Sequence, residues 1–194
     1  SPRASVETEI TPKTTLDEII STTKTSTVVL ASSKRVIEDL YIRLSENCEQ
    51  QGITLLCQGF GGGQSRIQAE FALAREPKIL VTTPLNYENY VLPQESVDTF
   101  VLQALPFDHP SHPVISERVK QYQDPFEEYS LPRMLLKVFR LLKTFLRHAK
   151  KKSTFILLDP RITTKPYGKV VTSFLSKILP STMTNTFPIQ QQLL

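Results

Sequence analysis

A row of basic side chains recurs at intervals of three or four residues between Pro132 and Ala149. Residues at this spacing share one face of an α-helix, and guanidinium and ammonium groups bind phosphate through charge-assisted hydrogen bonds. The pattern alone favours a solvated helix face, with a phosphate-binding surface as the alternative. The charged run that follows, His148 to Lys152, is expected to form a solvated turn, with contact to a phosphate backbone as its alternative. The row comprises Arg133, Lys137, Arg140, Lys143 or Thr144, and Arg147.

Glycines gather in the segment GFGGGQS, which follows an expected strand ending at Gln58 and precedes an expected helix. A strand, a glycine-rich loop and a helix N-terminus can together hold nucleotide phosphates. However, Gln64 stands ahead of Ser65 where a P-loop needs lysine, so a nucleoside triphosphate cradle is the least favoured interpretation. A flexible turn, which uses the tolerance of glycine for positive φ, is the second interpretation. In the third, backbone amides of the loop and Arg66 contact a nucleic-acid phosphate.

Three further groups of side chains could suggest chemistry. Asp108, His109 and His112 are spaced as metal ligands can be, but nearby prolines prevent a regular helix and no further His or Cys cluster completes a shell, so we expect no metal there. No GxSxG segment frames a serine nucleophile, which argues against serine-hydrolase chemistry. Asp159 and Arg161 follow an expected strand, where an internal ion pair is the favoured interpretation.

Five short segments are nearly continuous in Val, Ile, Leu or Phe, and helical patterns alternate with them. Continuous hydrophobicity indicates strands that are covered on both faces, as in a parallel sheet between layers of helices. The sequence therefore predicts an α/β fold with a mostly parallel sheet of about five or more strands covered by helices. The expected strands are Thr27 to Ala31, Thr54 to Gln58, Ile79 to Thr82, Phe100 to Ala104 and Thr154 to Leu158.

The composition fits a single intracellular domain. The 194 residues, 40% of them hydrophobic, are enough to build one core. A net charge of +4 favours an anionic partner, of which nucleic acid is the commonest. Cys48 and Cys57 have no CxxC spacing, which argues against a zinc site or a disulfide framework and for a reducing compartment. No apolar run approaches the roughly 18 residues that span a bilayer, so we expect no membrane contact.

Five blocks of sequence, in a fixed order, resemble the second motor domain of the DinG/XPD branch of superfamily 2 helicases. The most informative is the run from Phe126 to Gly168, which follows the order of the PFxxY, GRxxR, LDxR and YG segments of the family pattern without a gap. The resemblance covers about residues 15–180 and implies a RecA-like three-layer sandwich, with residues 1–14 as a leading arm or linker and residues 181–194 as a tail. The other blocks are VVLASSKRVIEDLY (Val28 to Tyr41), QGFGGGQSRIQAEF (Gln58 to Phe71), LVTTPLNYENYVLP (Leu80 to Pro93) and VLQALPFDHPSHPV (Val101 to Val114).

This resemblance implies an ATP-dependent DNA helicase with 5′ to 3′ polarity, cytoplasmic and nucleoid-associated in a bacterium or nuclear in a eukaryote. In the family a preceding N-terminal motor domain binds ATP and Mg²⁺ and usually carries an iron–sulfur cluster, and its Walker A, DEAH-type and four-cysteine motifs do not occur in this sequence. The domain would close over ATP held by that N-terminal domain, with Arg147 and Glu88 as catalytic residues and with Arg140, Lys143 and Arg147 at the nucleotide. Contacts to single-stranded DNA carry over to Ser32, Ser33, Lys34, Gln58, Gly59, Arg66 and Thr82.

Two departures from the family pattern support other interpretations. The Gly-Arg pair of the family falls on Lys143 and Thr144, and Val91 stands in place of the Asp of the EGxD block. Arg147 alone stays in register to face the terminal phosphate, where an arginine is worth roughly a thousandfold or more in rate. The first alternative is therefore a degenerate, non-hydrolytic module that binds nucleic acid or a partner protein. The second is an unrelated nucleotide-binding α/β domain that uses the glycine-rich loop.

Overall fold

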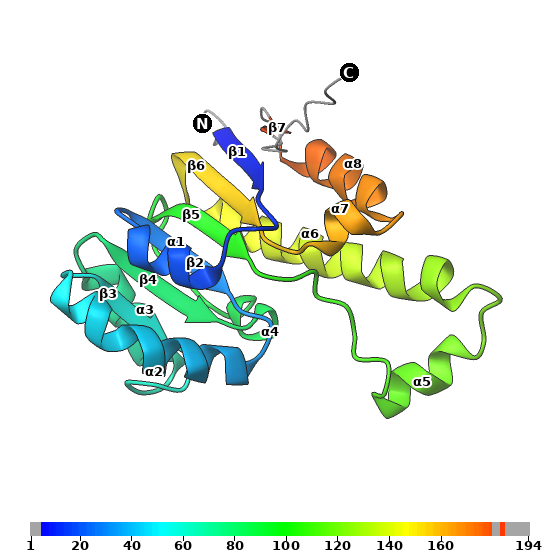
Figure 1. Cartoon of the computed structure of the whole chain (residues 1–194), viewed down its shortest axis with the longest axis horizontal. Helices are drawn as coiled ribbons and strands as arrows, with labels where there is room; N and C mark the ends of the chain where they lie inside the picture. Colours follow the sequence, from blue (N-terminus) through cyan, green and yellow to red (C-terminus); the bar gives the residue numbers. More distant parts are fainter. Residues whose placement is uncertain (1–4, 180–182, 185–194) are drawn as a thin grey trace, which may run out of the picture.

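The computed structural model describes residues 5–179 and 183–184. Within these residues, seven parallel strands form one sheet in the order β3-β4-β2-β5-β6-β1-β7, with helices on both faces (Figure 1). This arrangement confirms the predicted α/β, RecA-like architecture. The strands are β1 (Ser5–Ile10), β2 (Ser26–Leu30), β3 (Thr54–Cys57), β4 (Lys78–Thr82), β5 (Val97–Leu102), β6 (Ala149–Leu157) and β7 (Met183–Thr184).

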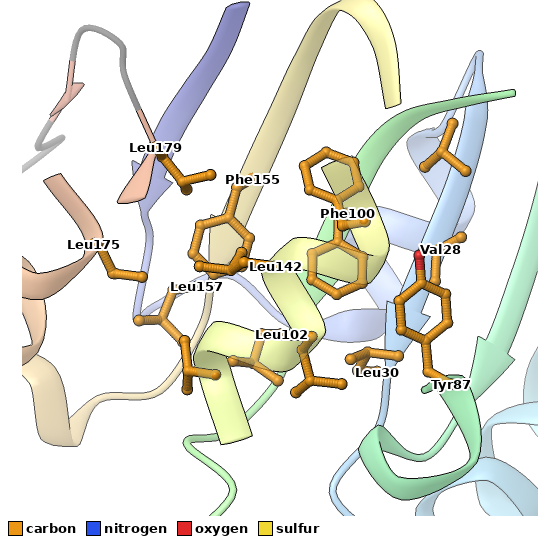
Figure 2. Packing of buried hydrophobic residues seen from close by; sticks show 14 of the residues in the cluster. Val28, Leu30, Tyr87, Phe100, Leu102, Leu142, Phe155, Leu157, Leu175 and Leu179 are labelled. Atoms are coloured by element: carbon orange, nitrogen blue, oxygen red, sulfur yellow. The ribbon is translucent and has the colours of Figure 1, made fainter. Parts of the chain in front are cut away.

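Two hydrophobic clusters lie on opposite faces of the sheet, because successive strand residues point to opposite sides. Val28 belongs to the first cluster and Val29 to the second. Figure 2 shows the first cluster, in which Phe100 and Phe155 of the sheet pack with Leu142 of the longest helix. The first cluster includes residues of α3 (Gln64–Leu73), α4 (Pro84–Tyr87), α6 (Leu131–His148), α7 (Arg161–Thr164) and α8 (Gly168–Ile178), and the second includes residues of α1 (Leu16–Thr22) and α2 (Lys34–Gln50).

Helix α6 matches the helix expected from Pro132 to about Ala149, and the turn η1 (Phe126–Ser130) precedes it. Its apolar side packs on the sheet, where the ring of Phe145 stacks on that of Phe100 with centroids 4.8 Å apart. The short helix α5 (Pro113–Val119) buries none of its residues and projects from the body (Figure 1). No helix in the described part of the chain is long and apolar enough to cross a bilayer. Because the apolar side of α6 packs on the sheet, its basic side lies at the surface.

The N-terminal segment differs from the arm or linker expected for residues 1–14. Ser5–Ile10 form β1, which pairs in parallel with both β6 and β7. Val6, Thr8 and Ile10 are buried whereas Ser5 is exposed, so the strand alternates in burial. A search for continuous apolar runs misses such a strand. Of the expected tail at 181–194, Met183–Thr184 form β7, and its other residues lie outside the described ones, as do residues 1–4.

The run from His148 to Lys152 is not the expected solvated turn. His148 is 4% exposed, and β6 begins at Ala149. The ammonium group of Lys150 lies 2.6 Å from Glu76 Oε1 and 2.8 Å from Asp98 Oδ2. One lysine of this run is therefore paired at the amino end of the sheet. The two carboxylates come from distant parts of the chain, so the sequence gives no sign of the pairing.

Candidate functional site

The carboxyl ends of several strands open onto a groove of about 1150 Å³. Ligands of open parallel α/β sheets bind outside this edge. The groove is lined by cations of α6 and by the segments that follow β2, β4, β5 and β6. Its lining includes four of the predicted site residues, namely Ser32, Lys34, Glu88 and Arg140.

Glu88 and Arg140 are in contact at the lining of the groove. Helix α4 begins after Thr83, whose hydroxyl accepts a hydrogen bond from the Asn86 amide, and Glu88 follows at its C-terminal end. The Arg140 Nε and Glu88 Oε2 atoms are 3.6 Å apart, and the arginine side chain is 52% exposed. Ion pairs at such exposure contribute about 0–1 kcal/mol. Arg140 can therefore exchange this partner for a phosphate at small cost.

Lys143 and Arg147 continue the row on the next turns of α6, outside the groove lining. The Lys143 ammonium lies 5.4 Å from the centre of the Phe139 ring, and Arg147 Nη2 donates to Thr144 Oγ1 at 3.3 Å. Thr144 itself is only 5% exposed. The outward row is thus Arg140, Lys143 and Arg147, and Thr144 belongs to the buried side.

Arg133 and Lys137, the first members of the row, are bound to Asp108. Arg133 Nε is 2.7 Å from Asp108 Oδ2, and Lys137 Nζ contacts the other carboxylate oxygen. Burial raises the pKa of Asp108, but the hydrogen bonds from both cations outweigh burial and leave that pKa below its ordinary value. Among the described residues no group of three or more His, Cys, Asp or Glu is placed to hold a metal ion. Asp108 therefore anchors its loop to α6, a role that sequence reasoning missed.

Gln58 and Thr82 join the ends of β3 and β4. Gln58 Oε1 accepts from Thr82 Oγ1 at 2.9 Å and from the Thr83 amide at 3.0 Å. Thr82 is fully buried. Its hydroxyl is thus not free to touch a ligand. Its part in any binding site is to hold Gln58, which in turn holds Thr83 of the groove lining.

The segment after β2 presents Lys34 to the groove. The Ser32 amide donates to Gln103 Oε1 at 2.7 Å, which fixes the strand end to the end of β5. Ser33 Oγ accepts from the Val36 amide at 3.3 Å and caps α2. The Ser32 amide and the Ser33 hydroxyl are therefore engaged in holding the fold. Lys34 is exposed and lines the groove, where its ammonium group can meet an anion.

The glycine-rich loop is held away from the groove lining. Gly59 has φ of +90°, which favours glycine, and the Phe60 ring stacks on Tyr41 of α2 with centroids 4.1 Å apart. Arg66 forms an ion pair with Glu70 at 2.7 Å. The loop therefore resembles a restrained turn more than an open phosphate cradle.

Asp159 and Arg161 form the expected internal ion pair. Arg161 Nη2 is 2.6 Å from Asp159 Oδ2, and the Leu105 amide donates to the same oxygen at 2.7 Å. Asp159 is 1% exposed. The pair joins the end of β6 to the segment that follows β5. Leu105 and Arg161 both line the groove, so the pair helps to fix its shape.

His148 is a buried group that the sequence did not single out. Its Nδ1 lies 3.2 Å from the Tyr87 hydroxyl, and its Nε2 accepts from the Leu92 amide at 3.3 Å. Burial, and then the charge of Arg147, lower the pKa of His148 from 6.5 to about 4. The imidazole is therefore neutral at neutral pH.

This lowered pKa predicts a pH-dependent stability. Between pH 6.5 and 4 the unfolded chain takes up a proton at His148 and the folded chain does not, so stability falls as pH falls through that window; the full difference corresponds to about 3 kcal/mol. Denaturant unfolding at pH 7 and pH 5 measures the loss. His148→Gln, which does not titrate, should show a smaller loss between the two, and an equal loss in both proteins would contradict the assignment.

Comparison with known proteins places these features in a family. Residues 16–178 match the family model described as the helicase C-terminal domain. The 3′-5′ exonuclease DinG of Bacillus subtilis (strain 168) is 30% identical over 164 residues, which cover 82% of this chain and 18% of that protein. The ATP-dependent DNA helicase YoaA of Escherichia coli (strain K12) is 24% identical over 110 residues, or 55% of this chain and 17% of that protein. The chain thus spans less than a fifth of either relative.

Two solved structures have a similar fold. An XPD helicase superposes with a TM-score of 0.62 at 16% identity, over 95% of this chain and 36% of that chain. S. tokodaii Xpd4 superposes with a TM-score of 0.53 at 14% identity, over 86% and 36% of the two chains. At these identities the likeness concerns the fold.

Proposed function

The chain belongs to the helicase C-terminal domain family, and from this premise we propose that it is the second motor domain of an ATP-dependent DNA helicase with 5′ to 3′ polarity. A preceding motor domain binds ATP and Mg²⁺, and this domain closes over the phosphates. Closure changes its hold on single-stranded DNA. The observation that carries the proposal is the exposed row of Arg140, Lys143 and Arg147 on α6, whose first member contacts Glu88 and lines the groove.

The residues of the groove and of α6 are suited to bind a nucleoside triphosphate, but not to hold a metal ion or an iron–sulfur cluster. Arg140 and Arg147 offer guanidinium groups with weak present partners, at 3.6 Å and 3.3 Å, and guanidinium binds phosphate oxygens in a bidentate manner. Among the described residues no group of three or more His, Cys, Asp or Glu is placed to hold a metal ion, and the proposal assigns Mg²⁺ to the preceding domain. The sequence has two cysteines, whereas an iron–sulfur cluster is usually held by four, so the proposal assigns a cluster to the preceding domain as well. Bound ATP supplies the phosphoryl group, and Arg147 stabilises its developing charge.

Single-stranded DNA binds along the carboxyl edge of the sheet in this proposal. Lys34 supplies a phosphate contact, and Ser33 and Gly59 offer backbone amides near their strand ends. Ser32, whose amide donates to Gln103, fixes the end of its strand. Gln58 and Thr82 hold the edge in shape, and Arg66 lies at the start of α3. Contacts of this kind go to the backbone of the nucleic acid, so binding is poor in sequence preference and steep in salt.

The isolated domain tests this division of labour. We expect no ATP turnover from it, because the groups that bind ATP and Mg²⁺ lie in the other motor domain. Its binding to a labelled oligothymidine should weaken with salt, and Lys34→Ala should reduce the slope of log K against log[salt] by about 0.7. Lys24→Ala, which removes an exposed lysine ahead of β2, is the matched control and should leave the slope unchanged. ATP turnover by the isolated domain would contradict the proposal.

Two residues favour a second candidate, a non-hydrolytic module that binds nucleic acid or a partner protein. Thr144 is buried where the family has an arginine, and Val91 is 76% exposed where the family has an aspartate. Both changes replace a charged side chain of the family pattern with an uncharged one. This candidate is distinguished from the first by nucleic-acid binding without ATP turnover in the native protein.

A further inference from the structure

The short segment that carries Glu88 is held at both of its ends by one side chain. It runs between Tyr87 and Leu92, and the two ring nitrogens of His148 contact the hydroxyl of the first and the amide of the second. His148 is the last residue of α6 and directly follows Arg147. One imidazole therefore links the end of α6 to both ends of the Glu88 segment.

The hydrogen bonds define the tautomer of this imidazole. Nε2 accepts from the Leu92 amide, so Nε2 carries no proton. In a neutral imidazole the other nitrogen is then protonated, and Nδ1 donates to the Tyr87 hydroxyl. Tyr87 is fully buried, and the two rings meet edge to face at 83°. The geometry is thus directional at both nitrogens, which an apolar side chain of similar size would not reproduce.

The middle of the same segment is held from the other side by α3. Gln64 Nε2 donates to the Asn89 carbonyl at 2.7 Å, and Gln68 Oε1 accepts from the Val91 amide at 2.8 Å. Glu88 is the member of the segment that points to the groove, where it meets Arg140. Side chains of α6 and α3 therefore hold the segment at three backbone atoms and at the Tyr87 hydroxyl, which fixes the backbone around Glu88 relative to both helices.

We propose that His148 is a positioning residue for ATP hydrolysis, which holds Glu88 and Arg147 at a fixed separation by joining the Glu88 segment to the end of α6. This inference rests on the proposed function. Groups that act together on a reacting phosphate must be placed closely, since a misplacement of about 1 Å can cost roughly a hundredfold in rate. His148 touches neither nucleotide nor DNA in this role.

Three substitutions in the native protein test the proposal. His148→Leu removes both hydrogen bonds and should lower kcat for ATP about tenfold to a hundredfold at saturating single-stranded DNA. KM for ATP and Kd for DNA should change less than about twofold, because the binding groups themselves remain. His148→Gln should recover most of the rate, because its carbonyl can accept from Leu92 and its amide can donate to Tyr87. Tyr87→Phe should give an intermediate loss.

A control and a second readout separate positioning from general destabilisation. Ser153→Ala removes a buried hydroxyl that donates to the Lys150 carbonyl at 2.8 Å, at the amino end of β6. It should lower stability without lowering kcat. Hydrogen exchange of the amides from Glu88 to Leu92 should speed up in His148→Leu and stay slow in His148→Gln.

The outcomes are distinct. Unchanged kcat in His148→Leu, no recovery in His148→Gln, or an equal loss in Ser153→Ala would each overturn the positioning role. If the native protein binds DNA but hydrolyses no ATP, the proposed function fails and the catalytic part of the inference fails with it. Hydrogen exchange then still decides whether His148 holds the Glu88 segment: unchanged exchange in His148→Leu would refute that as well.

Discussion

Arg147→Ala should lower the DNA-stimulated ATP turnover of the native protein by about a thousandfold. The reason is that Thr144, at the position of the first family arginine, is buried and cannot substitute, which leaves Arg147 as the guanidinium at the end of α6. Arg147 is exposed, and its hydrogen bond to Thr144 is long at 3.3 Å. The loss should therefore appear in kcat with little change in folding. Steady-state ATP hydrolysis at saturating single-stranded DNA measures it.

Two other cations of α6 are matched controls for this substitution. Lys143→Ala removes a charge that lies over Phe139 and should cost far less, because an ammonium is a point charge without the bidentate fork of guanidinium. Arg133→Ala removes one of the two cations that bind Asp108 and should act on the loop rather than on the chemical step. Equal losses in all three variants would mean that net charge, not the placement of Arg147, sets the rate.

Asp159→Ala should lower the free energy of unfolding by about 3–5 kcal/mol. The carboxylate is 1% exposed and accepts from Arg161 and from the Leu105 amide, so its removal leaves a partly buried guanidinium and a buried amide without their acceptor. Burial raises the pKa of Asp159, but hydrogen bonds from the Arg161 side chain and from the Leu105 and Arg161 amides outweigh it. The pKa therefore lies below its ordinary value, which is consistent with a charged native state. Chemical denaturation at pH 7 measures the change.

Asp17→Ala is the control, because its ion pair with Arg43 lies at the surface, with the two side chains about half exposed. Loss of that pair should cost about 0–1 kcal/mol. If Asp159→Ala costs no more than Asp17→Ala, the internal pair is not a structural anchor for the chain that leaves β5.

The sequence predicts the central sheet well because its strands are buried on both faces. β2 and β4 are buried at every position, and continuous Val, Ile and Leu therefore reveal them. β1 alternates between buried and exposed residues, and its glutamates resemble a linker. Because β1 is buried on one side only, it has no continuous apolar run. Its partner strand β6 lies more than a hundred positions away, so the sequence around β1 does not indicate the pairing.

The candidate site could be predicted where residues follow strand ends or share a helix face. The resemblance places Lys34 after a strand end and Arg140 on the basic helix face, and both line the groove. Thr82 also follows the rule, yet its hydroxyl turns inward to Gln58. The partners of His148 lie 56 and 61 residues away, and those of Asp108 lie 25 and 29 residues away, so spacing along the chain gives no signal for either.

ATP hydrolysis by the native protein, measured with and without single-stranded DNA, tests the central claim most directly. If this domain closes over ATP held by a preceding motor domain, turnover should be present and should rise with DNA. Intact DNA binding with no ATP turnover under either condition would contradict the motor function and would identify a helicase-like module that only binds.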